Sequence, residues 1–369
     1  MKPLRILHTE SSTGWGGQEI RILTEAQGML ARGHQIALLT PPDAEIYPAA
    51  RKLAIPVIAL PINRKQAKPL FDLRRWLARH GGDFDIINTH SSTDSWLTAI
   101  ASATLGGIPP MVRTRHVSTA INDHFSTRWL YLRATAHIVI AGEALRQQLH
   151  EKNGYPLDHI TSVPTGIDLK RFQPQPQAEA RAKLGLPDRP TLGILATLRD
   201  WKGHDYLLEA FARLRADFAH WHLLIIGDGP WRPRLDERLR HLDLAACVTF
   251  AGNQDDVPVW LNALDLFALP SFGDEGVPQS IMQAMACGLP VVSTPVGGIP
   301  EAVRDEQTGL LVPPKDAASL AASLARLMHD GVLRLRMGEA GRQRALDRFG
   351  IDIMLDRMES VFNRYRKHS

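Results

Sequence analysis

Cysteine is scarce in this sequence, and long apolar segments are missing from it. The 369 residues include only Cys247 and Cys287, which excludes a disulfide scaffold or a zinc site built on several thiolates and fits a reducing compartment. The first ten residues lack the apolar core of a signal peptide. The longest uncharged stretch, residues 95–112, contains Gly106-Gly107 and Pro109-Pro110, which a spanning helix would not tolerate in lipid. We therefore expect a cytoplasmic protein without a transmembrane helix.

A large excess of one charge is also absent. The net charge is +4, from 43 Lys and Arg against 39 Asp and Glu. Residues 1–168 hold 18 cations and 14 anions, whereas residues 169–369 hold 25 of each, so the whole excess lies in the first half. An anionic membrane surface, a phosphorylated ligand or nucleic acid would each account for this excess, and so would an ordinary solvated face.

Short apolar runs alternate with helical patterns along the chain. Alternation of this kind predicts βαβ units and parallel sheets. The expected strands are residues 4–8, 35–40, 57–60, 85–89, 111–114, 137–141, 160–163, 191–196, 221–227, 247–251, 266–269, 290–293 and 310–312. Expected helices of the second half are residues 206–216, 231–241, 258–263, 279–286 and 317–329.

A segment rich in proline and glutamine, residues 168–177 (DLKRFQPQPQ), divides this pattern and is interpreted as an interdomain linker. The sequence thus predicts an α/β protein with two Rossmann-like, doubly wound domains in tandem, residues 1–168 and 169–350. Ligands bind such sheets beyond the carboxyl ends of the strands, so we expect the active site in the cleft between the domains.

Three loops at expected strand ends carry candidate binding residues. Residues 14–17 (GWGG) join a strand to a helix, where glycines let backbone N–H groups approach an anion, although a tight turn would need the same residues. Arg199 and Lys202 follow the first strand of the second half and suit a diphosphate. Residues 271–288 form an acidic, glycine-bearing loop that enters a helix, and its carboxylates suit sugar hydroxyls.

Together these residues resemble the signature of the family 4 retaining glycosyltransferases, which have the GT-B fold. Glu275 is followed eight positions on by Gln283, then by AMACGLPVVST at residues 284–294 and GGIPE at residues 297–301. Further matches to the family occur in the same order at residues 16–19 (GGQE), 165–168 (TGID) and 227–230 (GDGP). Arg199 with Lys202-Gly203 matches as well. The resemblance covers nearly the whole chain. It implies a hexosyl- or related glycosyltransferase whose co-substrate is a UDP- or GDP-type sugar, and a C-terminal helix, about residues 351–369, that packs back on the first domain.

The resemblance assigns the nucleotide sugar to the second domain. Arg199 and Lys202 would neutralise the diphosphate leaving group, and Glu275 would hold sugar hydroxyls. Gln283 stands where the family usually has a second glutamate for the ribose hydroxyls, and a neutral amide makes a weaker hydrogen bond there. The further residues that the resemblance places against the donor are Gly16, Gly17, Gly229, Val277, Pro278 and Gln279.

His116, just past an expected strand of the first domain, resembles the family's active-site histidine near the 6-hydroxyl of the transferred sugar, and His90 is a second candidate. A packed or surface histidine is the alternative for both. The family retains the anomeric configuration without a side-chain nucleophile: the acceptor hydroxyl attacks on the leaving-group face, and the departing phosphate oxygen takes its proton. The protein would contribute positioning and electrostatic stabilisation.

The acceptor would dock on the first domain, which carries the basic excess. Many relatives act on lipid-linked or lipopolysaccharide acceptors at the inner face of the cytoplasmic membrane, so the resemblance implies a cell-envelope glycan or lipid-linked acceptor and no nucleic acid. A basic segment with interspersed aromatic residues fits peripheral contact with an anionic membrane, with an ordinary surface helix as the alternative. Its cations are Arg64, Lys65, Lys68, Arg74, Arg75 and Arg79.

Other enzyme classes remain alternatives to transfer. A nucleotide-sugar epimerase of the same fold would bind the same donor without an acceptor. A phosphorylase would need a lysine that carries pyridoxal and a much longer chain, and an NAD oxidoreductase would need GxGxxG after the first strand. The segment after Glu275 favours transfer.

We expect activity to persist in excess EDTA. A leaving diphosphate needs positive charge nearby, and Arg199 and Lys202 would supply it without a metal. Loss of activity in EDTA with rescue by Mg²⁺ or Mn²⁺ would refute this mechanism and point to Asp255 and Asp256 as ligands.

Overall fold

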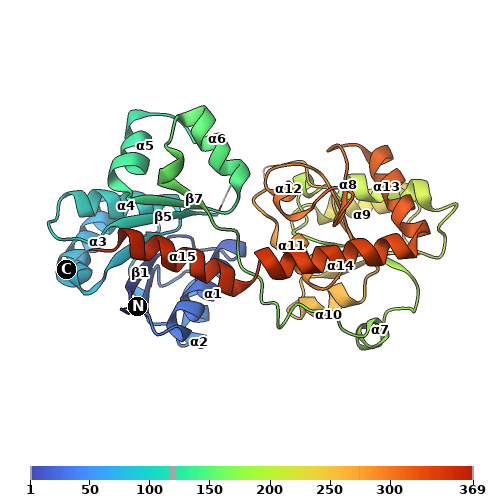
Figure 1. The fold of residues 1–369 in the computed structure, drawn as a ribbon, viewed down its shortest axis with the longest axis horizontal. Helices are drawn as coiled ribbons and strands as arrows, with labels where there is room; N and C mark the ends of the chain where they lie inside the picture. The colour runs from blue at the N-terminus through green and yellow to red at the C-terminus, as the bar shows by residue number, and fades with distance from the viewer. Residues whose placement is uncertain (1, 117–120, 274, 368–369) are drawn as a thin grey trace. The chain divides into compact units, whose positions relative to one another are not determined.

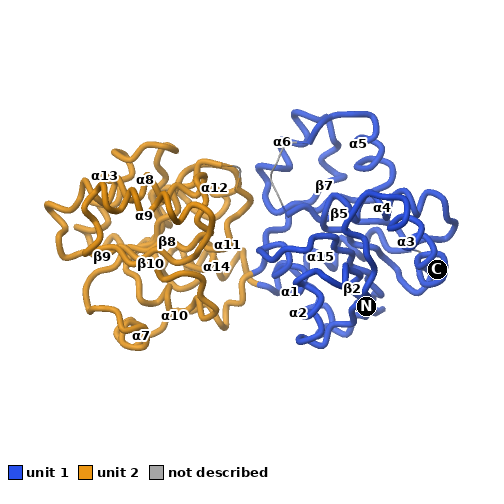
Figure 2. Tube along the Cα trace, turned by 180° about the vertical axis from the view of Figure 1, so that it is seen from behind, with its two compact units in different colours: residues 1–166, 351–369 blue, residues 167–350 orange. Residues whose placement is uncertain are grey.

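The computed structural model describes residues 2–116, 121–273 and 275–367, and the chain forms two compact units (Figures 1 and 2). Unit 1 comprises Met1–Gly166 and Ile351–Ser369, and unit 2 comprises Ile167–Gly350. The chain therefore passes between the units twice. The first crossing lies two residues before the boundary expected after residue 168, and the second lies at the expected residue 350.

Unit 1 is built on a seven-stranded parallel sheet in the order β3-β2-β1-β4-β5-β6-β7. Its strands are β1 (Arg5–Thr9), β2 (Gln35–Thr40), β3 (Val57–Ala59), β4 (Ile86–Thr89), β5 (Met111–Arg115), β6 (His137–Ile140) and β7 (Ile160–Ser162). Its helices are α1 (Gly17–Ala31), α2 (Ile46–Lys52), α3 (Ala67–His80), η1 (Gly81–Asp83), α4 (Ser92–Ala103), α5 (Phe125–Trp129), η2 (Leu130–Ala134), α6 (Glu143–Asn153), η3 (Leu157–His159) and α15 (Ile351–Tyr365).

Successive residues of these strands supply two cores, one on each face of the sheet. Ile6 and Ile86 pack with side chains of α1 and α15, whereas Leu7 and Ile87 pack with side chains of α3 and α4. This alternation follows from the two-residue period of a strand, and burial on both faces explains the continuous apolar runs in the sequence.

Helix α15 completes the first of these cores (Figure 1). Met358 and Phe362 are fully buried there, and a Cβ at Gly28 of α1 would lie 2.4 Å from Leu355. Arg32 at the end of α1 donates to the Asp356 carboxylate at 2.7 Å. Close helix packing at a glycine and an ion pair thus hold the last helix on unit 1.

Unit 2 is built on a six-stranded parallel sheet in the order β10-β9-β8-β11-β12-β13. Its strands are β8 (Thr191–Leu195), β9 (His222–Ile226), β10 (Val248–Gly252), β11 (Leu266–Leu269), β12 (Val291–Ser293) and β13 (Gly309–Leu311). Its helices are α7 (Gln177–Leu184), η4 (Asp200–Lys202), α8 (His204–Leu214), α9 (Arg232–His241), α10 (Val257–Asn262), α11 (Gln279–Ala286), α12 (Ile299–Ala302), α13 (Ala317–His329) and α14 (Gly331–Arg348).

The two-domain α/β prediction is confirmed. Each of the thirteen expected strands is present, and its ends differ from the expected ends by at most one residue. Helix α14 was not anticipated. Within the described residues, no helix is both long and apolar enough to cross a membrane.

The interpretation of residues 168–177 as a linker is wrong. Phe172 is buried in the core of unit 2, and the Gln175 backbone N–H donates to Asn262 Oδ1 at 2.8 Å. Asn262 Nδ2 in turn donates to the Gln173 carbonyl at 3.1 Å. The buried aromatic ring and the amide pairing make this segment an integral part of unit 2.

The strand order reverses at one position in each sheet. In unit 1 the reversal lies between β1 and β4, and in unit 2 it lies between β8 and β11. The connections that leave the two strands of such a pair lead to opposite faces of the sheet, so the loops at their carboxyl ends flank a crevice where ligands bind in such folds.

Candidate functional site

The loops after β8 and β11 carry the catalytic residues predicted for unit 2. Arg199 immediately precedes η4 and Lys202 ends it, in the loop after β8. Glu275 lies in the loop after β11, 73 positions beyond Lys202. Because β8 and β11 pair directly, the sheet brings these loops together at the reversal of strand order.

Lys202 and Glu275 form an ion pair. Lys202 Nζ lies 2.6 Å from Glu275 Oε1, and the Ser271 hydroxyl donates to the same oxygen at 2.8 Å. The side chain of Glu275 is 10% exposed and that of Lys202 is 21% exposed. Removing either partner would leave a poorly solvated charge behind. The pair therefore holds a cation and a carboxylate in one place at this edge of the sheet.

Arg199 supplies a second cation on the same loop. Its guanidinium carbon lies 5.0 Å from the centroid of the Trp201 ring, and its side chain is exposed. Gly203, with φ of +78°, follows η4, and a Cβ there would lie 2.0 Å from the Pro270 carbonyl oxygen. Only glycine fits this close approach, which holds the turn after Lys202 against the loop after β11.

Two glycines after β12 support the backbone of Glu275. Gly298 N–H donates to the Glu275 carbonyl at 3.0 Å. Gly297 has φ of +55°, and a Cβ there would lie 2.0 Å from the same carbonyl oxygen. The position of Glu275 therefore depends on a backbone approach that a larger residue would prevent.

Gly229 lies in the loop after β9, where a Cβ would meet the Leu198 carbonyl oxygen at 2.6 Å. Its N–H donates to the Asp228 carboxylate at 2.8 Å. Close packing against Leu198, the residue before Arg199, therefore accounts for the glycine at position 229. The nucleotide contact stays a prediction.

The other predicted donor residues lie around the start of α11. Val277 and Pro278 are buried and precede the helix, whereas Gln279 and Gln283 are half-buried, one turn apart. Asp274, part of the same acidic loop, lies outside the described residues.

Unit 1 contains a hydrogen-bonded row of three histidines. His8 belongs to β1, and His90 and His116 immediately follow β4 and β5. His8 Nδ1 lies 2.9 Å from His90 Nε2, and His90 Nδ1 lies 2.9 Å from His116 Nε2. Burial lowers the pKa of His8 to about 4 and the pKa values of His90 and His116 well below their usual range. All three rings are therefore neutral at pH 7.

Two buried carboxyl groups hold the loop after β1. Glu10 accepts hydrogen bonds from the Ser91 hydroxyl, the Gln18 amide and the Ser12 backbone N–H. Asp94, in the first turn of α4, accepts from Thr9, Ser11 and the His90 backbone N–H. Burial raises both pKa values, and the nearby Asp94 charge raises that of Glu10 further. Sequence reasoning found neither group, because their partners lie up to 85 positions away.

The predicted Gly16 and Gly17 lie where this loop meets α1. Gly16 is the residue before the helix, in an extended conformation, and Gly17 is the first helical residue. A Cβ at Gly16 would lie 3.7 Å from the Glu19 carboxylate, which is ordinary van der Waals contact. The packing at Gly16 therefore does not itself require glycine. The donor contact proposed for this pair stays a prediction.

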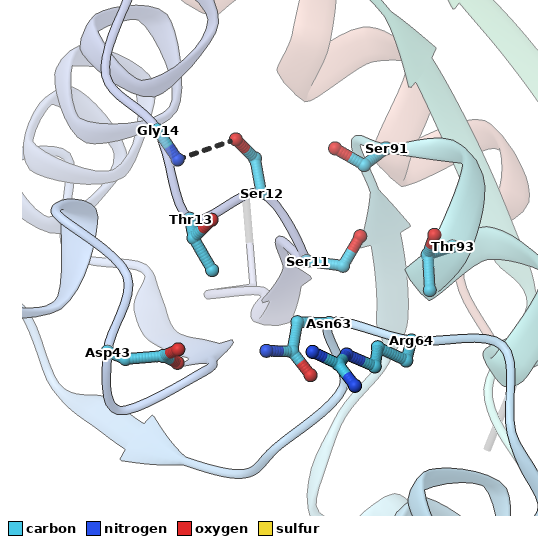
Figure 3. A pocket seen from close by; sticks show the side chains of 9 residues that line it. All are labelled: Ser11, Ser12, Thr13, Gly14, Asp43, Asn63, Arg64, Ser91 and Thr93. Carbon is cyan, nitrogen blue, oxygen red and sulfur yellow. Dashed lines mark hydrogen bonds between the residues drawn. The ribbon is translucent and has the colours of Figure 1, made fainter.

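A polar pocket of about 570 Å³ opens beside the loop after β1 (Figure 3). Hydroxyl and amide groups dominate its lining, and Asp43 and Arg64 each add a charge. Figure 3 shows Ser12 and Thr13 on the loop after β1, and Ser91 and Thr93 at the start of α4. The lining residues are Ser11, Ser12, Thr13, Gly14, Asp43, Asn63, Arg64, Ser91 and Thr93. Such a lining suits a ligand rich in hydroxyl groups.

Within residues 2–116, 121–273 and 275–367, no three His, Cys, Asp or Glu side chains are grouped so that they could hold a metal ion. Asp256 pairs with Lys183 at 2.9 Å, and the Asp255 carbonyl accepts from Arg171 at 2.6 Å. The metal requirement of the reaction stays a prediction.

Comparison with known proteins identifies relatives of both units. A family model described as "Glycosyltransferase Family 4" matches residues 15–171, and one described as "Glycosyl transferases group 1" matches residues 189–330. A phosphatidyl-myo-inositol mannosyltransferase of Mycobacterium leprae is 28% identical, over 94% of this chain and 92% of its own.

Solved structures share the fold. A glycosyltransferase from Rickettsia africae has a TM-score of 0.89 at 21% identity and covers 99% of both chains. Anabaena HepE in complex with UDP-glucose has a TM-score of 0.83 at 21% identity, covering 98% of this chain and 100% of its own.

We predict that Gly297→Ala destabilises unit 2 more than Gly252→Ala does. Both glycines have positive φ, +55° and +71°, so alanine costs about 1–2 kcal/mol of conformational energy at either position. Only at residue 297 would the new Cβ also meet a backbone oxygen, because nothing lies within 4 Å of a Cβ at residue 252. Urea unfolding monitored by tryptophan fluorescence gives both free energies of unfolding. Equal losses would show that Gly297 does not support Glu275.

Proposed function

Because this chain belongs to glycosyltransferase family 4 and has the GT-B fold, we propose that it moves a sugar from a UDP- or GDP-type sugar to a glycan or lipid-linked acceptor of the cell envelope. The observation that carries the proposal is the Lys202–Glu275 pair at the strand-order reversal of unit 2. It places a cation beside a carboxylate where this kind of sheet binds ligands.

Lys202 and the exposed Arg199 would bind the donor diphosphate. Arginine can grip two phosphate oxygens, and lysine adds a compact charge. Glu275 would accept hydrogen bonds from the transferred sugar, since an ionised carboxylate is an acceptor only. The ion pair thus connects the group that meets the leaving phosphate to the group that positions the sugar.

The reaction would proceed with retention. The acceptor oxygen bonds to the anomeric carbon as the bond to the diphosphate oxygen breaks, and the acceptor proton passes to that departing oxygen. Positive charge develops on the sugar and negative charge on the diphosphate. Lys202 and Arg199 would stabilise the negative charge on the diphosphate electrostatically. His116 would contact the 6-hydroxyl of the sugar.

Gln283 would meet the ribose through its amide. One turn of α11 separates it from Gln279, and both side chains are half-buried. An amide oxygen accepts from a hydroxyl as a neutral partner, so this contact is weaker than a carboxylate would make.

The acceptor would use unit 1. The pocket beside Ser12 and Ser91 offers hydroxyls and the Asn63 amide to a polyol, with Arg64 available to an acidic substituent. The mannosyltransferase relative is named for an inositol lipid, a polyol with a phosphate. That likeness supports an acceptor of the same chemical type.

Helix α3 would contact an anionic membrane peripherally. It buries Leu73 and Leu77 and exposes Phe71, whose relative exposure is 63%. Arg75 and Arg79 are exposed on the same helix. An exposed aromatic ring with cations fits the headgroup region of a bilayer.

Two cations of the same segment have other contacts. Lys65 Nζ donates to the Ser92 hydroxyl at 3.0 Å and lies 5.9 Å from the Trp96 ring centroid, while Arg64 lines the pocket. The membrane contact is therefore better tested on α3 itself.

We predict that Glu275→Gln lowers kcat by about 10² to 10³ and leaves nucleotide diphosphate affinity unchanged or tighter. The variant keeps the shape of the side chain, removes the charge that holds the sugar hydroxyls and frees Lys202. Lys202→Ala should instead weaken nucleotide diphosphate binding and turnover together. Calorimetry and a transfer assay measure the two quantities.

Two outcomes would overturn these assignments. Equal loss of nucleotide diphosphate binding and transfer in Glu275→Gln would move Glu275 to the nucleotide. Interconversion of free nucleotide sugars by the wild type, without any acceptor, would indicate an epimerase in place of a transferase.

We predict that Arg75→Glu with Arg79→Glu weakens binding to anionic liposomes more than tenfold at low salt. Each cation near such a surface contributes about 1 kcal/mol, which is screened as salt is added. Arg336→Glu with Arg348→Glu changes the net charge equally on exposed positions of α14 and serves as the control. Sedimentation with vesicles measures binding, and equal binding by the two double variants would exclude α3 as the membrane contact.

A further inference from the structure

The three histidines follow a diagonal across adjacent strands of the unit 1 sheet. His8 is in register with Asn88 on β4, and Asn88 is in register with Val112 on β5. His90 and His116 therefore lie progressively further toward the carboxyl ends of their strands. The row leads from the centre of the sheet to the edge where a ligand would bind.

The inner end of this row is enclosed and its outer end is accessible. His8 is 0% and His90 3% exposed, whereas His116 is partly exposed. Neighbouring rings lie edge to edge and close to one plane, with centroids 5.2 Å apart and interplanar angles of 14° and 29°. Their mutual hydrogen bonds and their burial leave the rings of His8 and His90 little freedom to turn.

The row lies among charged groups but stays neutral. Arg21 and Glu25 of α1 are fully buried on this face, and the Arg21 charge further lowers the pKa values of His90 and His116. Glu25 accepts from the Asn88 amide at 3.4 Å, and Asp94 accepts from the His90 backbone. A neutral imidazole carries one proton, so each ring donates through one nitrogen and accepts through the other.

The surroundings of His8, at the buried end of the row, determine which ring donates each hydrogen bond. His8 Nε2 is buried and has no hydrogen-bond partner among the described residues. A buried N–H without an acceptor is rarer and costlier than an unused lone pair, so the His8 proton belongs on Nδ1. It then donates to His90 Nε2, which forces the His90 proton onto Nδ1, from which it donates to His116 Nε2.

We propose that His8 and His90 are positioning residues that hold His116 with its proton on Nδ1, so that His116 presents an N–H donor to the substrate. Within the described part of the chain, no group bonds that nitrogen. In a neutral imidazole, the hydrogen bond made by one ring nitrogen decides whether the other nitrogen carries the proton. Here the hydrogen bonds between the three rings fix the tautomer of each ring in turn, from His8 in the core to His116 at the site. The donor would meet a hydroxyl oxygen of the sugar, and this last step rests on the proposed function.

The tautomer is measurable without substrate. In the full chain with ¹⁵N-labelled histidine, two-bond ¹H–¹⁵N correlation spectra at pH 7 should show His8, His90 and His116 protonated on Nδ1, the minor form of free histidine. His116→Gln and His90→Gln assign the signals by their loss. A proton on His116 Nε2 in the wild type overturns the proposal, whatever reaction the protein performs.

A matched pair of variants tests the transmission. His8→Asn keeps an N–H donor near the position of Nδ1, and His8→Leu has about the same size without it. His8→Leu should shift His116 toward protonation on Nε2 and lower kcat three- to tenfold, the scale of one hydrogen bond, with nucleotide diphosphate affinity unchanged. His8→Asn should restore both the tautomer and kcat.

His137→Leu is the control for disturbance of the sheet. His137 is 1% exposed on β6 and belongs to no part of the row, so its removal should leave the His116 tautomer unchanged. An unchanged His116 tautomer in His8→Leu would refute the transmission. An unchanged kcat in that variant, despite a changed tautomer, would refute the role of the donor in transfer and leave the row itself in place.

Discussion

The parallel pairing of β8 with β11 is the constraint on which the Lys202–Glu275 site of unit 2 depends. These strands are separated in the sequence by β9 and β10, which pair on the other side of β8. Only this order lets the loop that carries Lys202 meet the loop that carries Glu275. Close backbone approaches at Gly203 and Gly297 then set the spacing between the loops that carry the ion pair.

Much of the fold could be predicted from the sequence because buried parallel strands are apolar on both faces and stand out as short continuous runs. The family motifs identified Arg199, Lys202 and Glu275 for the same reason that the fold brings them together: each follows a strand end. Residues 168–177 were misinterpreted as a linker because proline and glutamine dominate the segment. The burial of Phe172 depends on tertiary packing, which the local composition does not reveal. His8 escaped notice because it lies within an apolar run, and Glu10 and Asp94 because their roles depend on contacts between distant loops.

The two units differ in how their functional candidates and charged side chains are exposed to solvent. In unit 2 the side chain of Lys202 is 21% exposed beside the buried Glu275, so a ligand can approach the ion pair from the lysine side. Unit 1 buries His8, Arg21, Glu25 and Asp94 and satisfies most of their polar atoms internally. A buried polar network is costly to rearrange and therefore specifies one arrangement, which suits a surface that must present a fixed pattern of donors and acceptors.

The placement of α15 has a consequence for biosynthesis. Met358 and Phe362 belong to the core of unit 1, yet they are translated after all of unit 2. During synthesis, the face of α1 that receives Leu355 stays without its cover until the final helix has left the ribosome, although unit 2 is by then complete. Domains usually fold in the order of their synthesis. In this protein the N-terminal unit is the last to finish, and truncated chains would expose an apolar helix face to chaperones and proteases.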